Sequence, residues 1–208
     1  MGTVAKTPDP THSTPEPFGA SRRPPAQETA PPLAVEPPEK DRITARDGRT
    51  LVLREIYAGD VLALQRGFAR LSPEEVRMRF LHPLTELPHD FAVRLCDLDP
   101  ATSVAFVFID LPDEPEREIR GVARAYIDPT TLSGEFAIVV QRQYTGQGLG
   151  MRLMRCLIDA CRERGAEELW GDVFIDNGAM LALCDSLGFR RQLLEHEPGL
   201  MRVTLALT

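Results

Sequence analysis

The stretch Gln143-Tyr144-Thr145-Gly146-Gln147-Gly148-Leu149-Gly150 joins an apolar segment to an amphipathic one. Residues 136–140, with the sequence FAIVV, predict a strand. After them, apolar residues recur at the spacing of one helix face, at Gly150, Leu153, Met154, Leu157, Ile158 and Cys161. A glycine loop that opens a helix presents backbone N–H groups at the positive end of the helix dipole. The stretch therefore predicts a site for the phosphates of a nucleotide-like cofactor; an ordinary strand-to-helix turn is the alternative.

The spacing of these glycines differs from two common phosphate-binding loops. A Walker loop needs Gly-Lys-Ser/Thr, whereas Gly148 is followed by Leu149. A dinucleotide fingerprint of the form G-x-G-x-x-G would use Gly146 and Gly148, but its third glycine position is occupied by Met151. That fingerprint also opens a domain, whereas this loop lies deep in the chain.

The composition narrows the class of protein. The chain has 208 residues, enough for one domain and a tail, and 43% of them are hydrophobic. A net charge of -7 argues against a general nucleic-acid binder. No apolar run is long enough to cross a membrane. The four cysteines lack the spacing of a metal site, so no metal is expected; they are Cys96, Cys156, Cys161 and Cys184. We expect a reducing cytoplasm as the compartment.

The N-terminal segment has a composition of its own. Ten of the 18 prolines lie within residues 1–43, where apolar residues are sparse and show no period. Such a segment cannot bury enough surface to offset its ordering entropy. We expect a disordered, proline-rich tail over residues 1–43, with a docking peptide for a polyproline reader as the alternative. The folded domain is expected over residues 44–208.

The rest of the chain predicts one mixed sheet with helices around it. Strands are expected at residues 50–56, 104–109, 121–127, 135–140, 168–174, 189–193 and 201–207. Helices are expected at residues 60–70, from Ser72 to about residue 80, from Pro88 to about residue 97, at 149–164 and at 177–187. This order indicates an α/β protein, of the mixed α+β kind, with a central and mostly antiparallel sheet flanked by helices.

The spacing Gln-x-x-Gly-x-Gly, late in a domain of this size, resembles the coenzyme A loop of the GNAT N-acetyltransferase superfamily. A second stretch strengthens the resemblance, because Asn177 opens a predicted helix that ends at Leu187-Gly188-Phe189. The resemblance implies the GNAT acyl-CoA N-acyltransferase fold and acetyl-CoA as co-substrate. It implies that backbone amides of the loop hold the pyrophosphate, the residues being Gln143, Thr145, Gly146, Gln147, Gly148, Leu149 and Gly150.

The same resemblance assigns further contacts to the cofactor. It implies that Ile138, Val139 and Val140 offer main-chain hydrogen bonds to the pantetheine arm. It also places Asn177 near the pantetheine or a phosphate, although an Asn at a helix start is equally a plain N-cap. One residue departs from the family pattern. Many members place a Tyr four residues before the helix-ending glycine to protonate the leaving thiolate, and this chain has Cys184 there.

Three further stretches resemble the catalytic domain of bacterial Pat-type protein lysine acetyltransferases. They are residues 71–80, 121–124 and 134–140, and the likeness extends over roughly residues 45–207. It implies transfer of acetyl to the ε-amine of lysine in a protein, by direct attack in a ternary complex. A small-molecule amine acetyltransferase and a non-catalytic acyl-CoA sensor are the alternatives.

Glu135 is the candidate general base. A free lysine amine has a pKa of about 10.4, so a base must remove its proton before it attacks. Glu135 stands beside the apolar run 136–140, where burial would raise the pKa of a carboxylate, and the Pat resemblance puts the catalytic glutamate here. The alternative is that Glu135 closes a hairpin and faces water. Arg124 is expected diagonally across from Glu135 on the neighbouring strand, where its charge would lower that pKa.

Overall fold

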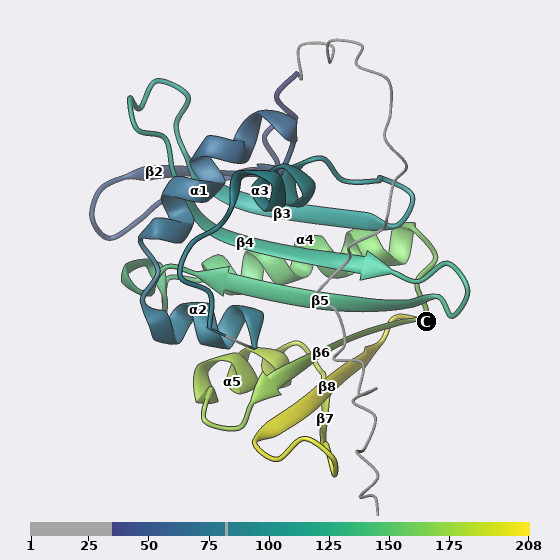
Figure 1. Ribbon diagram of the computed structural model, residues 1–208. Coiled ribbons are helices and arrows are strands. Elements are labelled where there is room, and N and C mark those ends of the chain that lie inside the picture. The colour runs from purple at the N-terminus through teal and green to yellow at the C-terminus, as the bar shows by residue number, and fades with distance from the viewer. Residues whose placement is uncertain (1–34, 82) are drawn as a thin grey trace, which may run out of the picture.

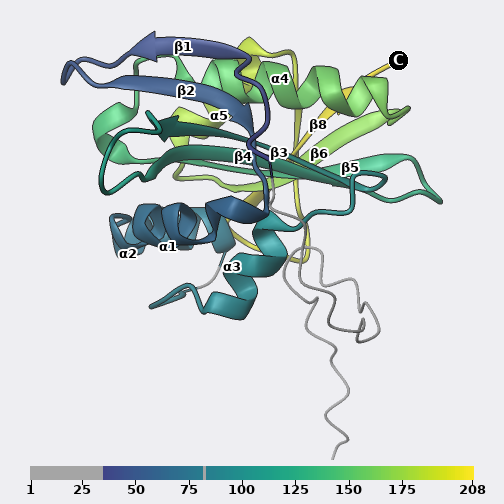
Figure 2. The ribbon, with the colours of Figure 1, turned by 90° about the horizontal axis from the view of Figure 1, so that it is seen from above.

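The computed structural model describes residues 35–81 and 83–208, which form one sheet with helices on both faces (Figures 1 and 2). The strands are β1 (Asp41–Thr44), β2 (Thr50–Glu55), β3 (Ser103–Asp110), β4 (Ile119–Ile127), β5 (Ser133–Val140), β6 (Glu168–Phe174), β7 (Arg190–Leu193) and β8 (Leu200–Ala206). The helices are α1 (Val61–Ala69), α2 (Pro73–Phe80), α3 (His89–Cys96), α4 (Leu149–Glu163) and α5 (Gly178–Ser186), with short 3-10 turns η1 (Ala58–Asp60) and η2 (Arg142–Tyr144). The predicted mixed sheet flanked by helices is confirmed.

The sheet has eight strands in the order β1-β2-β3-β4-β5-β6-β8-β7. Neighbours pair antiparallel throughout the described strands except for β5 and β6, which run parallel. Helices α1, α2 and α3 cover one face over β2 to β5, and α4 and α5 lie on the other (Figure 2). The first face of β6 and β8 carries no helix (Figure 1).

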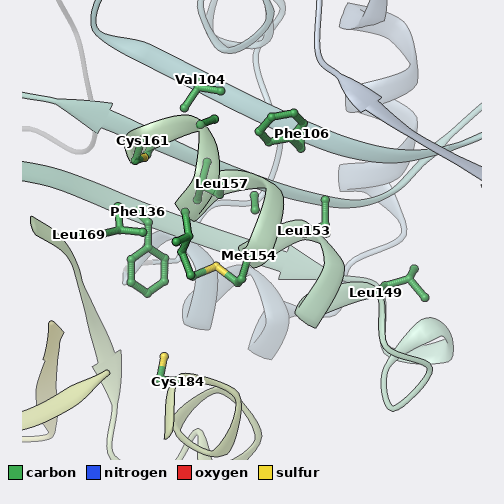
Figure 3. Close-up of a cluster of buried hydrophobic side chains, with 14 of the residues drawn as sticks. Val104, Phe106, Phe136, Leu149, Leu153, Met154, Leu157, Cys161, Leu169 and Cys184 are labelled. Atoms are coloured by element: carbon green, nitrogen blue, oxygen red, sulfur yellow. The ribbon is translucent and has the colours of Figure 1, made fainter. Parts of the chain in front are cut away.

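The main core lies between α4 and the sheet (Figure 3). The apolar residues of α4 predicted from helical spacing are buried, with Leu153, Met154, Leu157 and Cys161 at 0% exposure. They pack against β-strand residues such as Phe106 and Phe136. Because α4 begins directly after the glycine loop, this packing also fixes the position of the loop.

The opposite face is tied to the sheet through α1 and α2. Gly67 of α1 lies so close to β4 that an added Cβ would be 2.3 Å from the Ile119 carbonyl oxygen. Helix α2 begins with the predicted capping box, in which Ser72 accepts from the Glu75 amide and the Glu75 carboxylate accepts from the Ser72 amide. Glu75 also accepts a 2.8 Å hydrogen bond from the Arg142 amide, which connects α2 to the segment before α4.

The predicted boundary between tail and domain falls inside structured chain. Strand β1 starts at Asp41 and pairs with β2, and it was not predicted. Upstream of it, Glu36 accepts hydrogen bonds from the buried Arg54 at 2.7 Å and from Arg117 at 2.6 Å. These two cations hold residues before Asp41 against the sheet, so the domain begins earlier than residue 44. The prediction for residues 1–34 lies outside the described residues.

The described helices were compared with the length and apolar character that a membrane span requires. Within residues 35–81 and 83–208, none of the helices is long and apolar enough to cross a bilayer.

Candidate active site

Strands β5 and β6 separate in the middle of the sheet. They pair only over residues 133–135 and 168–170, where Glu135 is opposite Trp170. Beyond that point β5 continues to Val140 and β6 to Phe174 without pairing to each other. We call residues 136–140 the free edge of β5.

The register with β4 decides which backbone groups the free edge offers. The Ser133 carbonyl accepts from Asp128 and the Gln141 amide donates to Arg120, so odd-numbered residues of β5 direct their backbone toward β4. Even-numbered residues therefore direct theirs toward β6. Ile138 and Val140 thus have main-chain groups that do not pair with β4, and their predicted contact with the pantetheine arm stays a prediction. Val139 differs, because its N–H and C=O point to β4 opposite Val122.

Gly171 brings β6 close to β5 just where they part. A Cβ at this position would lie 2.9 Å from Cε1 of Phe136 and 3.1 Å from the Phe136 carbonyl oxygen. A residue with a side chain would therefore push the strands apart at the start of the free edge. Sequence reasoning missed Gly171, since an isolated glycine in a strand has no specific meaning until its neighbour is known.

The glycine loop connects the end of β5 to α4 with an open surface. Gly146 and Gly148 have φ of 67° and 85°, and nothing lies within 4 Å of a Cβ built on either. The backbone N–H groups of residues 146–151 have no acceptor within the described chain. A row of free N–H groups at a helix N-terminus is suited to binding phosphate oxygens.

The loop is held in place by buried anchors and by the β1–β2 turn. Tyr144 is 1% exposed and its hydroxyl donates to Asp47 at 3.0 Å, and Leu149 is also 1% exposed. Arg46 donates from its amide to the Gln147 side chain at 2.8 Å and from its guanidinium to the Gly146 carbonyl at 2.9 Å. Arg46 thus adds an exposed cation to the loop, which sequence reasoning missed because about a hundred residues separate the two segments.

The remaining predicted loop and helix-start residues fall around the same edge. The side chain of Gln147 donates to the Gln143 carbonyl at 2.8 Å, and Thr145 Oγ1 donates to the Arg142 carbonyl at 2.8 Å. A Cβ on Gly150 would lie 3.2 Å from Leu183 of α5 and 4.0 Å from Ile138. Asn177 caps α5 by accepting from the Met180 amide at 3.1 Å. The plain capping role of Asn177 is thus confirmed, while its predicted cofactor contact stays a prediction.

Glu135 occupies the last paired position of β5, beside the free edge. Its side chain is half-buried on the face that carries α1, α2 and α3, because it alternates with the core residue Phe136. The pKa of Glu135 is raised, first by burial and then by the negative charge of Asp172. The positive charges of Arg202 and Arg79 oppose this and are the weaker influence. Such a carboxylate can accept a proton from a cationic amine.

Arg124 lies where the sequence predicted but does not act on Glu135 as expected. It pairs with Ala137, so it is diagonal to Glu135 on the same face. Its guanidinium is buried and donates to the Leu95 carbonyl at 3.0 Å, and it is not among the charges that shift the pKa of Glu135. The conflict between the two residues is therefore resolved in favour of a raised pKa.

Comparison with known proteins identifies the family. The model of the acetyltransferase (GNAT) family matches residues 67–189. The acetyltransferase PA5475 of Pseudomonas aeruginosa is 33% identical over 143 residues, which is 69% of this chain and 76% of that protein. The chain belongs to the GNAT acetyltransferase family. Part of the chain is also similar to the [ribosomal protein bS18]-alanine N-acetyltransferase of Escherichia coli K12, at 41% identity over 68 residues, or 33% of this chain and 44% of that one.

Solved GNAT structures share the fold. The GNAT domain of S. lividans PAT superposes with a TM-score of 0.68 at 22% identity, covering 80% of this chain and 96% of that domain. The yncA protein of Salmonella typhimurium, solved with its cofactor acetyl-CoA, gives a TM-score of 0.53 at 19% identity and covers 76% and 94% of the two chains. As a GNAT acetyltransferase, the protein uses acetyl-CoA as co-substrate.

The residues present fit acetyl-CoA on structural grounds. The amides of residues 146–151 have no acceptor within the described chain, and the space beside Gly146 and Gly148 is open, as a pyrophosphate requires. The free edge of β5 leads from this loop back to Glu135 and spans roughly 13 Å at the usual strand rise. No group of metal-ligating side chains occurs in the described part of the chain.

Cys184 cannot take over the proton-donating role of the Tyr found in many GNAT enzymes. It is 0% exposed within the core between α5 and α4 (Figure 3). Burial raises the pKa of the Cys184 thiol to about 12, so it holds its proton too tightly to act as an acid near neutral pH. The interpretation of Cys184 as a packing residue is confirmed.

Sequence reasoning missed the charged residues that surround Glu135. Asp172 of β6 accepts two 2.8 Å hydrogen bonds from Arg202 of β8, and the Arg202 guanidinium lies 4.0 Å from the ring centre of Trp170. These residues come together because β6 pairs with β8, which sets Asp172 opposite Arg202 on the same face of the sheet. The alternation of β6 predicts that Trp170 and Asp172 share a face, but only the strand order puts that face beside Glu135.

Proposed function

We propose that this protein transfers acetyl from acetyl-CoA to the ε-amine of lysine in protein substrates, with Glu135 as the general base. One observation carries the proposal: Glu135 is a half-buried carboxylate with a raised pKa at the point where β5 leaves β6. The proposed reaction is direct attack of the amine on acetyl-CoA in a ternary complex, which Glu135 as a base supports because it can take the proton of the attacking amine.

The chemistry of the step sets the demand on Glu135. Acetyl-CoA supplies a thioester, and the lysine must reach it as a neutral amine although its free pKa is about 10.4. Glu135 accepts the proton that the ammonium group loses, directly or through a water. A raised pKa makes Glu135 a stronger base than an exposed carboxylate.

The surroundings of Glu135 suit a cationic side chain delivered by a protein. Glu135 and Asp172 place two carboxylates on a sheet face that no helix of the described chain covers at β6 and β8 (Figure 1). Trp170 and the aliphatic part of Arg202 add apolar surface for the stem of a lysine.

The α-amine of a protein N-terminus is the second candidate acceptor. It is favoured by the likeness to alanine N-acetyltransferases of ribosomal protein bS18, of which this chain spans less than half the length. An α-amine has a pKa near 7.7–8.0 and therefore needs less help from a base. Glu135 with its raised pKa argues for the more basic lysine amine.

Mass spectrometry separates these candidates. The full-length protein is incubated with isotopically labelled acetyl-CoA and a bacterial lysate, and labelled sites are mapped on peptides and on the small-molecule fraction. We expect label on lysine side chains, lost with the Gly148→Asp variant and strongly reduced with Glu135→Gln. Label confined to protein N-termini or to small amines would contradict the lysine assignment, and no label in any fraction would point to an acyl-CoA sensor.

A further inference from the structure

A cavity lies between the helices α1 to α3 and the strands β4 and β5. Its volume is about 40 Å³, and its lining is mostly apolar. A single water needs about 10–15 Å³, so the cavity can hold more than one water or a small ion. Three arginines line this apolar space, Arg79 from α2 and Arg120 and Arg124 from β4.

Arg79 and Arg124 are deeply buried and remain charged. Arg79 is 8% exposed and Arg124 is 5% exposed. Burial lowers the pKa of Arg79 to about 9, helped by the charge of Arg124, and burial lowers the pKa of Arg124 to about 10. Because both values lie above neutral pH, Arg79 and Arg124 are cations on the cavity wall, and buried charges normally require a partner of opposite sign.

Arg124 lacks such a partner. Its Nη2 donates to the Leu95 carbonyl at 3.0 Å, but its buried Nε–H has no acceptor within the described residues. Among the described residues, the group that favours the charged form of Arg124 is Cys96, and burial raises the pKa of the Cys96 thiol to about 12, so the thiol is neutral. A third lining arginine, Arg120, differs because Asp110 and Glu118 hold it at 2.7 and 2.6 Å.

We propose that this cavity binds a small monovalent anion, a halide or a free carboxylate, which accepts the hydrogen bond of Arg124 Nε and lies against the guanidinium of Arg79. The volume admits such an ion and excludes a nucleotide or a coenzyme. The apolar lining would strengthen the attraction between the anion and both cations. The cavity shares Val139 with the free edge of β5, and its existence does not depend on the acceptor of the acetyl group.

The anion site also has a route to the candidate base. Arg79 is influenced by Arg124 on one side and by Glu135 on the other. An anion beside Arg79 would weaken the attraction between Arg79 and the Glu135 carboxylate. Anion binding in the cavity would thus change the electrostatic surroundings of Glu135 through the side chain of Arg79.

Anomalous diffraction tests the proposal on the unmodified protein. Crystals of the full chain are soaked in sodium bromide, and parallel crystals in sodium acetate, to distinguish a halide from a carboxylate. We expect an anomalous bromide peak, or planar acetate density, within hydrogen-bond distance of Arg124 Nε. Water alone in the cavity under both conditions would overturn the proposal.

Thermal unfolding provides a second measurement in solution. Bromide and acetate titrations of the wild-type protein should give a rise in Tm that saturates, as binding to one site requires. Arg124→Met should lose this saturable rise, whereas Arg94→Met, which removes an exposed arginine of α3, should keep it. A wild-type Tm without a saturable response to either anion would count against the site, as would an unchanged response in Arg124→Met.

Discussion

The protonation behaviour of Glu135 is set by four influences that can be separated by substitution. Burial and Asp172 raise its pKa, and Arg202 and Arg79 lower it. Asp172 and Arg202 are themselves joined by two hydrogen bonds of 2.8 Å, so Asp172 both repels the Glu135 charge and partly neutralises the cation that attracts it. Removing the charge of Asp172 should therefore affect Glu135 twice in the same direction.

The first prediction concerns Asp172→Asn. Loss of its negative charge, together with a less compensated Arg202, should lower the pKa of Glu135. The acid limb of the kcat/KM profile against pH should then move to lower pH, since that profile reports groups of the free enzyme. Asp185→Asn is the matched control, because Asp185 pairs with Arg191 in the same manner but is not among the charges that shift Glu135. An acid limb that stays in place or moves upward would contradict this account.

At the scale of elements, the loop before α4 and the meeting point of β5 with β6 are built on glycines for different reasons. Gly146 and Gly148 provide positive φ and an open surface, whereas Gly171 permits close approach of two strands. The distinction predicts that substitution affects binding at the loop and stability at the strand.

Gly148→Asp should abolish acetyl-CoA binding. The carboxylate would stand where free amides receive phosphate, and the positive φ adds strain of about 1 kcal/mol for any residue with a Cβ. Gly165→Asp carries the same strain, with φ of 77° and open space, at the other end of α4, about 22 Å away by helix rise. Calorimetry should find no acetyl-CoA binding for Gly148→Asp and normal affinity for Gly165→Asp; equal affinities would show that the phosphates bind elsewhere.

Gly171→Ala should destabilise the fold. The new methyl group would meet the ring and the carbonyl oxygen of Phe136 at 2.9 and 3.1 Å, and the carbonyl cannot yield without moving β5. Overpacking of this kind costs about 1–3 kcal/mol. Gly178→Ala, where nothing lies within 4 Å, should be neutral or slightly stabilising. Urea titration measures the free energy of unfolding of both variants, and we expect the lower value for Gly171→Ala. Equal values for the two variants would mean that β5 and β6 can separate freely.

For the whole molecule, a buried ion cluster joins the first described residues to the sheet. Arg54 is 0% exposed and makes two 2.7 Å hydrogen bonds to Asp60 and one of 2.7 Å to Glu36. Arg54→Met would leave Asp60 buried without its cation, which typically costs 3–5 kcal/mol. The exposed pair of Arg42 with Glu39 is the control, and Arg42→Met should change the unfolding free energy by less than about 1 kcal/mol. A similar small loss in both variants would show that the cluster does not hold the N-terminal residues.

Much of the element order could be predicted from local patterns. The capping box at Ser72, the glycine loop and the helical spacing after Gly150 each act within a few residues, and each was confirmed. Strand β1 was missed because four residues beside prolines do not show an alternation long enough to recognise. Its place in the sheet depends on pairing with β2 and on the ion pairs of Glu36.

The candidate site was predictable only in part, because part of it arises from strand order. Glu135 and the loop glycines were found from their sequence context. Asp172 and Arg202 join them only when β6 pairs with β8, and the direction of the Val139 backbone follows from the register with β4. A difference of one residue in register reverses both face and backbone direction, and no local pattern in the chain determines that register.

The central claim is that Glu135 removes the proton from the acceptor amine beside the free edge of β5. Its raised pKa means that the native state holds the Glu135 proton more tightly than the unfolded chain does, so this residue favours folding at low pH and disfavours it as pH rises through that pKa. Glu135→Gln should therefore keep or slightly raise Tm at neutral pH. A loss of activity in this variant would not come from unfolding.

The most direct test is the turnover of Glu135→Gln against pH at saturating acetyl-CoA and lysine peptide. Near neutral pH we predict a loss of about a hundred- to ten-thousand-fold, with unchanged acetyl-CoA affinity, and a smaller loss at high pH where more lysine is already neutral. Glu168→Gln, an exposed carboxylate at the start of β6, should keep near wild-type turnover. Wild-type turnover by Glu135→Gln near neutral pH would contradict the claim and leave Glu135 a structural residue of β5.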